Sequence, residues 1–192
     1  MDKKFHFDLE TTGVRYWKNG IHQLAGMIEI GGEIKEEFDF HIKPHPKAIV
    51  EGEALAISGK KVSDLETHEE MMDVHSKLIN IMDRHINRYD PNDKFTMYGY
   101  NCSSFDCQFL RAFFTQNGDK YFGSWFWSVP VDVIVVAMDK VQCQRSEMEN
   151  FQLRTVCKWC GVEFDEEKAH DALYDIRKTR ELYEKIKNIK IL

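Results

Sequence analysis

Two carboxylates near the N-terminus form the first candidate for chemistry. Asp8 and Glu10 alternate with Phe7 and Leu9 in a short apolar segment that runs directly into a Thr-Thr-Gly turn. Successive side chains on a strand point to opposite faces, so the two acids share one face and the two apolar residues share the other. Two carboxylates held this close repel each other unless a cation lies between them. The pair therefore predicts half of a divalent-metal site.

A third acid follows a strand-like segment in the middle of the chain. Residues 96–101 have the composition of a strand, and the residues after them resemble the opening of a helix with Ser103 or Ser104 as its N-cap. Asp106 then falls in the first turn of that helix. This position makes it a candidate to complete the metal site.

A histidine and a fourth acid lie near the C-terminus. Asp175 belongs to a predicted helix whose apolar residues recur at helical spacing. His170 is five residues earlier, and on one helix the two side chains would point in different directions. We therefore expect His170 in the loop before the helix, with Asp171 near the N-cap, so that both side chains reach one pocket.

These segments resemble the three exonuclease motifs of the DEDDh family, which includes the proofreading epsilon subunit of bacterial DNA polymerase III, ribonuclease T and oligoribonuclease. The matching motifs are FDLETTG with Asp8 and Glu10, NCSSFDCQFL with Asp106, and HDALYD with His170 and Asp175. The motifs follow one another in the family's order and span nearly the whole chain. A weaker likeness joins EALAISG to the family's Ala-x-x-Val-His-Gly segment, with Ile57-Ser58-Gly59 in place of Val-His-Gly. The resemblance implies a DnaQ-like 3′–5′ exonuclease.

The chemistry of phosphodiester hydrolysis explains these residue types. The reaction needs an activated water, stabilisation of extra negative charge, and help for the departing 3′ oxygen. Two metal ions about 4 Å apart can supply all three. Mg²⁺ and Mn²⁺ prefer oxygen ligands, which are offered by Asp8, Glu10, Asp106 and Asp175. Histidine accepts protons near neutral pH, so His170 is the candidate general base.

Substrate contacts are expected around the same site, because an exonuclease must thread a terminal nucleotide into it. Single strands are commonly held by stacking on aromatic side chains, and two aromatic residues closely follow the Thr-Thr-Gly turn. The resemblance places the backbone around Leu9 and Thr11 against the terminal sugar, with Ile57 nearest to the family's wedge residue. The expected contacts are Leu9, Thr11, Thr12, Tyr16, Trp17, Ile57, Asn101 and Phe105.

Each residue taken alone has a plainer interpretation. Asp8 and Glu10 could lie on the solvent-exposed face of a half-buried strand. Asp106 could be a first-turn aspartate favoured by the helix dipole, and His170 could be a surface histidine. Trp17 could simply cover the edge of the core. The ordered combination in three separate segments favours the nuclease.

Composition and charge limit how tightly the protein can bind nucleic acid, but they do not identify its partner. The 192 residues are 43% hydrophobic and 30% charged, with a net charge of −6 and five cysteines. The chain has no long basic run, so we expect weak, salt-sensitive phosphate contacts. Candidates for such contacts are Arg15, Lys18, Arg111, Lys140, Arg145 and Lys168.

No membrane span or signal peptide is evident, which predicts a cytoplasmic protein with reduced thiols. Cys157 and Cys160 fit core thiols better than a zinc site.

The expected fold is one α/β exonuclease domain over residues 1–192. Strands are predicted at residues 4–10, 22–30, 33–42, 94–101 and 129–137, and helices at 51–57, 69–88, 103–115, 151–161 and 171–187. Gly31-Gly32 predicts a hairpin turn between the second and third strands. Residues 118–126 are predicted to form a packed loop. A meander followed by helix-connected strands predicts a mixed five-stranded sheet flanked by helices, which resembles the ribonuclease H-like fold. The family's aspartate at Asp132 ends a buried strand and is expected to be structural.

Three functions remain open. The first is a metal-dependent exonuclease that releases nucleoside monophosphates from the 3′ end of single-stranded DNA. The second is an exoribonuclease for short RNA or RNA 3′ ends, because the sequence does not reveal contacts to the 2′-hydroxyl. The third is a proofreading subunit bound to a DNA polymerase, and a homodimer is also compatible with the sequence.

Overall fold

The computed structural model describes residues 2–189, apart from the side chains of residues 142–144. Five strands form one sheet in the order β3-β2-β1-β4-β5. Their bounds are β1 Lys3–Thr11, β2 Ile21–Ile30, β3 Glu33–His41, β4 Thr96–Gly99 and β5 Val131–Asp132. β1, β2 and β3 are antiparallel neighbours, whereas β4 runs parallel to β1 and β5 parallel to β4. The predicted mixed five-stranded sheet is confirmed.

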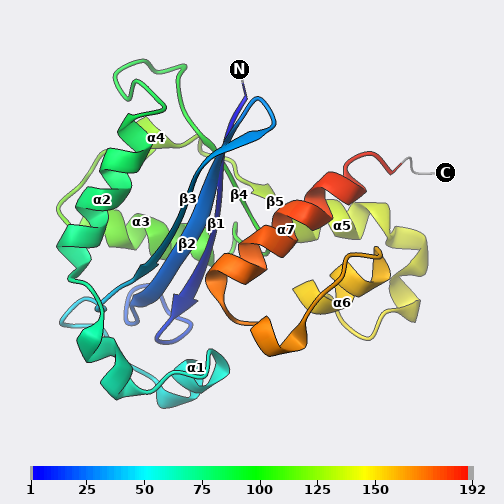
Figure 1. The fold of residues 1–192 in the computed structure, drawn as a ribbon, viewed down its shortest axis with the longest axis horizontal. Coiled ribbons are helices and arrows are strands. Elements are labelled where there is room, and N and C mark those ends of the chain that lie inside the picture. The colour runs from blue at the N-terminus through cyan, green and yellow to red at the C-terminus, as the bar shows by residue number, and fades with distance from the viewer. Residues whose placement is uncertain (1, 190–192) are drawn as a thin grey trace.

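Helices flank both sides of this sheet (Figure 1). On one side lie α2 (Met71–Asp83), α3 (Asp106–Gln116) and α4 (Phe122–Trp125), and on the other α5 (Val133–Lys140), α6 (Leu153–Trp159) and α7 (Ala172–Ile186). α1 (Gly52–Ile57) follows β3, and short 3-10 helices occupy Val62–Thr67, Gln142–Glu147 and Glu166–Lys168. Within residues 2–189, no helix combines the length and hydropathy that crossing a bilayer requires.

The alternation along β1 sets the character of the two faces. Phe5, Phe7 and Leu9 are buried in the larger core with side chains of α2 and α3. The residues between them, including Asp8 and Glu10, therefore point to the opposite face, which α7 covers. The predicted separation of acids from apolar residues on this strand is confirmed.

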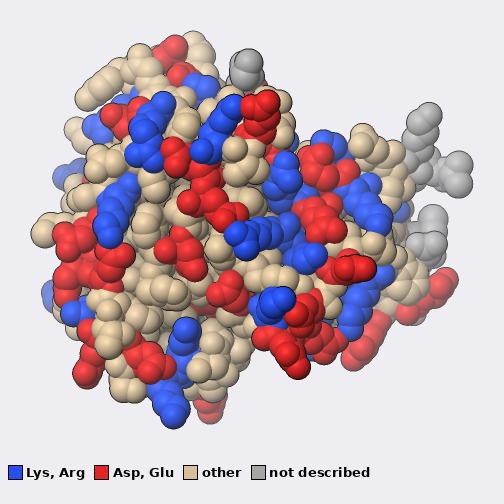
Figure 2. All heavy atoms as spheres, in the orientation of Figure 1, with Lys and Arg blue, Asp and Glu red and all other residues tan. Residues whose placement is uncertain are grey.

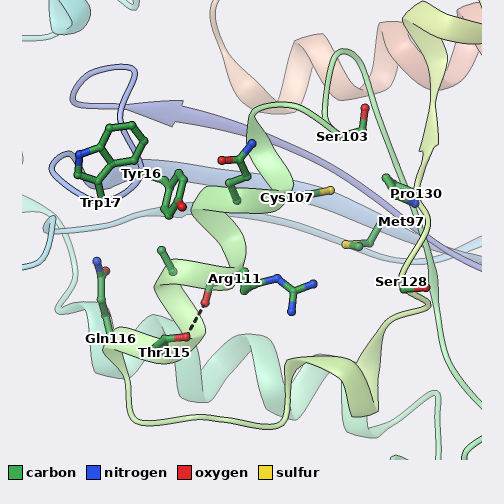
Figure 3. A pocket seen from close by; sticks show the side chains of 12 residues that line it. Tyr16, Trp17, Met97, Ser103, Cys107, Arg111, Thr115, Gln116, Ser128 and Pro130 are labelled. Carbon is green, nitrogen blue, oxygen red and sulfur yellow. Dashed lines mark hydrogen bonds between the residues drawn. The ribbon is translucent and has the colours of Figure 1, made fainter.

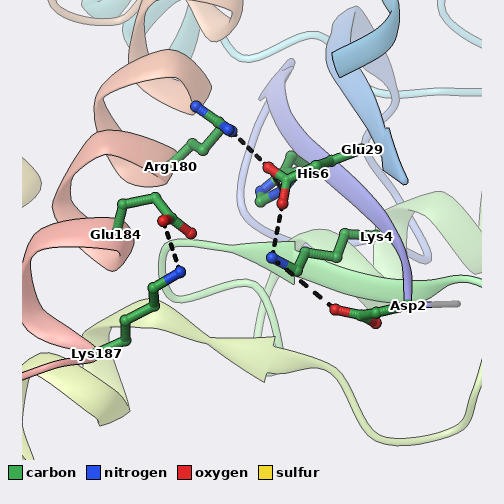
Figure 4. Close-up of polar contacts among 7 residues, drawn as sticks. All are labelled: Asp2, Lys4, His6, Glu29, Arg180, Glu184 and Lys187. Atoms are coloured by element: carbon green, nitrogen blue, oxygen red, sulfur yellow. Dashed lines mark hydrogen bonds and ion pairs between the residues drawn. The ribbon is translucent and has the colours of Figure 1, made fainter. Parts of the chain in front are cut away.

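A buried ionic cluster holds α7 against that face (Figure 4). Glu29 on β2 is 1% exposed, and its carboxylate pairs with Lys4 Nζ at 2.7 Å and with Arg180 Nε at 2.6 Å. His6 Nε2 lies 3.4 Å from Glu29 Oε2. Hydrogen bonding by His6 and the two cations lowers the pKa of Glu29. The cluster links β1 and β2 to α7, the helix that carries Asp175.

The strand predicted over residues 129–137 is wrong. The chain forms only the two-residue β5 and then turns into α5. Asp132 Oδ1 accepts a hydrogen bond from Ile134 N at 3.3 Å and so caps the helix. Val133 and Ala137, one helical turn apart, are buried, whereas Val135 is 60% exposed. The run of β-branched residues favours a strand by propensity, but tertiary packing on α7 selects a helix.

Other predicted boundaries need smaller corrections. The helix predicted over 69–88 ends at Asp83, and the one predicted over 151–161 covers Leu153–Trp159. α3 begins at Asp106, and its N-cap is Phe105 rather than a serine. Residues 118–126 are packed as expected but contain α4. The Gly31-Gly32 hairpin is confirmed, with φ of 61° and 89°, values that favour glycine.

Candidate active site

The three motifs meet at the carboxyl end of β1. β1 and β4 are parallel neighbours, so the chain leaves both strands at the same edge of the sheet, where ligands commonly bind in α/β folds. Asp8 and Glu10 lie near the end of β1, and Asp106 opens α3 after β4. Asp175 lies in the first turn of α7. Three elements far apart in the sequence thus deliver acids to one place.

A cavity of about 590 Å³, here named the acid cavity, lies between these elements. Eight of the predicted site residues line it, namely Asp8, Leu9, Glu10, Asn101, Phe105, Asp106, His170 and Asp175. All five residues predicted to be catalytic are therefore brought together.

His170 lies in the loop before α7, as the sequence predicts. Its backbone N–H donates to Asp175 Oδ2 at 3.1 Å, and ligand atoms of Glu10, His170 and Asp175 all lie within 4.8 Å of one another. The residue has a φ of 65°, a left-handed conformation that is costly for a residue with a side chain. The N-cap of α7 is Asp171, whose Oδ1 accepts from Tyr174 N at 2.9 Å. The helix start and the hydrogen bond to Asp175 hold the imidazole at the cavity.

The turn before α3 positions Asp106 through Asp132. The carboxylate of Asp132 accepts hydrogen bonds from the backbone N–H groups of Asn101 at 2.8 Å and Ser103 at 2.9 Å. Ser103 also donates through its hydroxyl, which explains why it does not cap α3. Asn101 has a φ of 58°, again in the left-handed region. These contacts are the ones that a structural aspartate would make.

Burial and the charges of neighbouring acids raise the pKa values of all four acids. Burial, reinforced by the charges of Asp106, Glu10 and Asp175, raises the pKa of Asp8 well above its usual value. Burial and the neighbouring acids raise the pKa of Glu10 to about 8. For Asp106, burial outweighs hydrogen bonds from backbone N–H groups and raises the pKa to about 7. Burial raises the pKa of Asp175 to about 6, although the hydrogen bond from His170 N acts to lower it.

This donor set fits a hard divalent cation. Four carboxylates converge without an ion pair among the described residues, and Asp175 Oδ1 is buried with no hydrogen-bond partner there. Among residues 2–189, the group of ligand side chains close enough to share one ion is Glu10, His170 and Asp175. Carboxylate oxygens are the ligands that Mg²⁺ and Mn²⁺ prefer, and a bound cation would favour the charged carboxylates against the burial and repulsion that raise their pKa values.

The remaining predicted contacts lie outside the lining of the acid cavity. Thr12 is buried, and its hydroxyl donates to Ile49 O at 2.9 Å and accepts from Gly20 N at 2.9 Å. Thr11 donates to Gly13 O at 2.8 Å. Ile57 on α1 is 61% exposed. Tyr16 and Trp17 line a different cavity.

Sequence reasoning missed several side chains that line the acid cavity. α6 and its flanks contribute Phe151, Gln152, Leu153 and Arg154, and Phe164 follows. Arg154 is the cationic member of this lining. Nothing in the local pattern around Arg154 marks it, because its place depends on how α6 packs beside α7.

Other charged residues and thiols need no special site. Lys168, a predicted phosphate contact, pairs with Asp165 at 3.0 Å, and Cys157 is buried in the core beneath α5 and α7. On the face shown in Figure 2, Lys and Arg alternate with Asp and Glu rather than forming one basic band. This agrees with the absence of a long basic run in the sequence.

Comparison with known proteins places this geometry in a family. Residues 5–183 match the RNase T model of the exonuclease family. The chain belongs to this family. The membership confirms the DnaQ-like, DEDDh-type resemblance of the three motifs.

Relatives of this exonuclease-family chain are longer proteins. DNA polymerase III PolC-type from Bacillus cereus is 26% identical over 174 residues, which cover 90% of this chain and 10% of the polymerase. Escherichia coli Exonuclease I in complex with a dT13 oligonucleotide superposes with a TM-score of 0.78 at 18% identity, over 98% of this chain and 42% of that one. A zinc-bound complex of E. coli Exonuclease I with single-stranded DNA gives a TM-score of 0.76 at 18% identity, over 97% and 40% of the two chains. These likenesses confirm the ribonuclease H-like fold.

Proposed function

We propose that the protein is a metal-dependent 3′–5′ exonuclease that releases nucleoside monophosphates from the 3′ end of single-stranded DNA. The observation that carries the proposal is the convergence of four carboxylates and one histidine from β1, α3 and α7 on one cavity. Family membership supports the reaction. The oligonucleotide-bound Exonuclease I relatives support single-stranded DNA as the substrate.

Asp8, Glu10, Asp106 and Asp175 are the proposed metal ligands, for two Mg²⁺ or Mn²⁺ ions. When bound, such ions activate the attacking water and stabilise the charge on the phosphate and on the departing 3′ oxygen. The side chains are held in advance by β1 and by the starts of α3 and α7. Rigid carriers of this kind reduce the reorganisation needed during the reaction.

His170 is the proposed general base. Its side chain is exposed and lies beside Glu10 and Asp175, so it can take a proton from the attacking water and pass it to solvent. The carboxylate of Asp175 holds the loop through the backbone N–H of His170. His170 therefore stays near the reacting groups without being a rigid part of a helix.

Leu9, Asn101 and Phe105 are the proposed contacts to the terminal nucleotide, since they line the acid cavity beside the acids. The ring of Phe105 is braced by Phe109 at a centroid distance of 5.0 Å and offers a surface on which a base can stack. Arg154, across the cavity on α6, is suited to the phosphate because its planar guanidinium can donate two hydrogen bonds.

The proposal is tested with 5′-labelled dT12 and rU12 in the presence of Mg²⁺ or Mn²⁺. We expect a ladder that shortens by single nucleotides from the 3′ end, faster on DNA, with release of thymidine monophosphate. Asp106→Asn should slow release by about a hundredfold or more, whereas Asp93→Asn, a substitution of an acid paired with Lys3, should not. Internal cuts, digestion from the 5′ end, or full activity in EDTA would contradict the proposal.

The polymerase relative favours a second candidate, a proofreading role beside a DNA polymerase. Nearly the whole chain aligns with a small part of the PolC-type polymerase, so a similar domain exists there in one polypeptide with polymerase activity. The test is size-exclusion chromatography of this protein with the replicative polymerase of the same organism. Co-elution together with faster removal of a mismatched 3′ terminus would support this role, and separate elution would exclude a stable complex.

A further inference from the structure

A second cavity, of about 520 Å³, lies along α3 and is here named the α3 groove (Figure 3). Tyr16 and Trp17 stand on one side of the helix, and Ser128 and Pro130 stand on the other. The volume is within the range of about 300–1,000 Å³ that ligand sites commonly have. The mechanism proposed above does not use this cavity.

The aromatic wall of the α3 groove is exposed without a packing reason. Trp17 is 67% exposed and Tyr16 is 37% exposed. Their rings meet edge to face, with centroids 5.1 Å apart. Large exposed aromatic side chains on one rim are a feature of binding surfaces, and they suit unpaired bases because every base has a face that can stack.

The loop that carries this wall is held in place. Thr12 N donates to Gly20 O at 2.8 Å and closes the loop at its base. Asn19 Nδ2 donates to Ile49 O at 2.8 Å, and a Cβ atom at Gly13 would lie only 2.3 Å from the Asn19 side chain. A loop ordered by such contacts loses little conformational entropy when a ligand binds. The wall is therefore preformed.

The charge in the α3 groove suits a polyanion. Arg111 is the charged side chain of the lining, which contains no carboxylate. Its guanidinium lies 4.5 Å from the ring centroid of Phe122, and no carboxylate pairs with it among the described residues. In a chain with a net charge of −6, an arginine held in position with free donors is a site for phosphate.

The alternative route away from the acid cavity is less suitable. A cavity along α6, here named the α6 groove, is lined in part by Glu149, Arg154, Lys158 and Glu166. Lys158 pairs with Glu166 there, and the charges of Arg154 and Glu149 also cancel, so the groove has no net charge. A nucleic acid strand would meet carboxylates and no net positive charge along α6, whereas the α3 groove offers Arg111 and no carboxylate.

The linings of the two cavities come together at the start of α3. Phe105 and Asp106 line the acid cavity, whereas Ser103 and Cys107 line the α3 groove. Consecutive Cα atoms are about 3.8 Å apart, so the two linings approach each other within this short segment. A strand whose 3′ end occupies the acid cavity would reach the α3 groove by passing over this segment.

We infer that the α3 groove binds the single-stranded nucleic acid on the 5′ side of the scissile bond, with bases against Tyr16 and Trp17 and a phosphate at Arg111. This inference rests on the proposed function. It adds that the protein holds several nucleotides beyond the terminal one, and that a duplex is a poor ligand because its stacked bases cannot reach the aromatic wall.

The test measures the affinity of 5′-fluorescein-labelled dT2 and dT12 by anisotropy, in an Asp8→Asn background that cannot cut them. Trp17→Ala should weaken dT12 binding by about 5- to 150-fold, the effect of losing one to three kcal/mol of stacking. Arg111→Gln should reduce the slope of log affinity against log salt by about 0.7, the value for one phosphate contact on a single strand. Both should change dT2 binding by less than about twofold. Trp17→Phe should keep most of the affinity, which separates stacking from misfolding.

Matched controls lie elsewhere on the surface. Tyr89→Ala removes an aromatic side chain that is 84% exposed, and Arg84→Gln removes an arginine that pairs with Glu36. Neither should alter the affinity for dT12 or its salt dependence. Unchanged dT12 binding in both Trp17→Ala and Arg111→Gln overturns the inference. The same is true if Arg154→Gln, and not Arg111→Gln, removes the advantage of dT12 over dT2.

A small substrate separates this inference from the proposed function. The p-nitrophenyl ester of thymidine 5′-monophosphate can occupy the acid cavity without reaching the α3 groove. If the wild-type protein hydrolyses the ester but the groove variants bind dT12 normally, the exonuclease proposal stands and the groove inference fails. If neither the ester nor dT12 is hydrolysed, the proposed function itself fails.

Discussion

Uptake of a divalent cation at pH 7 should release protons, because the acid cavity holds them in metal-free protein. The pKa is raised to about 8 for Glu10, about 7 for Asp106 and about 6 for Asp175. At pH 7 these groups are then about nine-tenths, about half and about one-tenth protonated. Together they hold about 1.5 protons, and Asp8, whose pKa is also raised, adds up to about one more. A cation displaces these protons when it binds the carboxylates.

The assay is calorimetric titration of chelator-treated protein with Mn²⁺ at pH 7, in buffers with different ionisation enthalpies. The slope of observed enthalpy against buffer enthalpy gives the number of protons released, which we expect to be about 1.5–2.5. Glu10→Gln should lower this number by about one. Asp93→Asn should leave it unchanged, because the hydrogen bond from Lys3 lowers the pKa of Asp93. Mn²⁺ binding with a slope of zero at pH 7 would refute the reasoning.

Three further perturbations test the base, the fold and the electrostatics. His170→Ala should lower kcat at pH 7.5 by about 10²–10⁴-fold while Mn²⁺ still binds, and full turnover would remove its role as base. Arg180→Ala should lower the free energy of unfolding in urea by about 2–3 kcal/mol. The substitution leaves the buried carboxylate of Glu29 with only one of its two cations, Lys4. Arg177→Ala, which breaks an exposed pair on the same helix, should cost less than about 1 kcal/mol, and equal losses would contradict the account of the cluster. In chelator-treated protein the thermal unfolding temperature should decrease as the pH is raised from 6.5 to 8. In this range Glu10 still holds a proton in the folded protein, whereas it has lost that proton in the unfolded chain. Buried histidines, whose pKa values are lowered by burial, do not oppose this trend, because above pH 6.5 they are largely neutral in the folded and the unfolded chain alike. Excess Mg²⁺ should remove most of this decrease. An unfolding temperature that rises with pH in this range would contradict the raised pKa of Glu10.

Sequence patterns that depend on near neighbours predicted the structure well. The alternation at Asp8 and Glu10 gave the correct face of β1, because strand geometry fixes it residue by residue. Asp171 was correctly placed at the N-cap of α7, and His170 in the loop before it, since capping chemistry is local. The order of the three motifs then led to the family without any contact information.

Features that depend on packing between distant elements could not be read from the sequence. The valine-rich segment after Asp132 forms a helix because α7 offers an apolar surface, which no local propensity reveals. Arg154 reaches the acid cavity only through the placement of α6. Trp17 was expected near the terminal base, but the loop is closed by Thr12 and Asn19 and turns Trp17 toward α3.

A crystal of the protein soaked in Mn²⁺ shows directly whether the four acids form a metal centre. We expect anomalous density bound by carboxylate oxygens of Asp8, Glu10, Asp106 and Asp175, with the His170 side chain beside it. In Asp106→Asn crystals this density should disappear or be strongly reduced. Anomalous density located away from these carboxylates, or none at a saturating concentration of Mn²⁺, would contradict the claim.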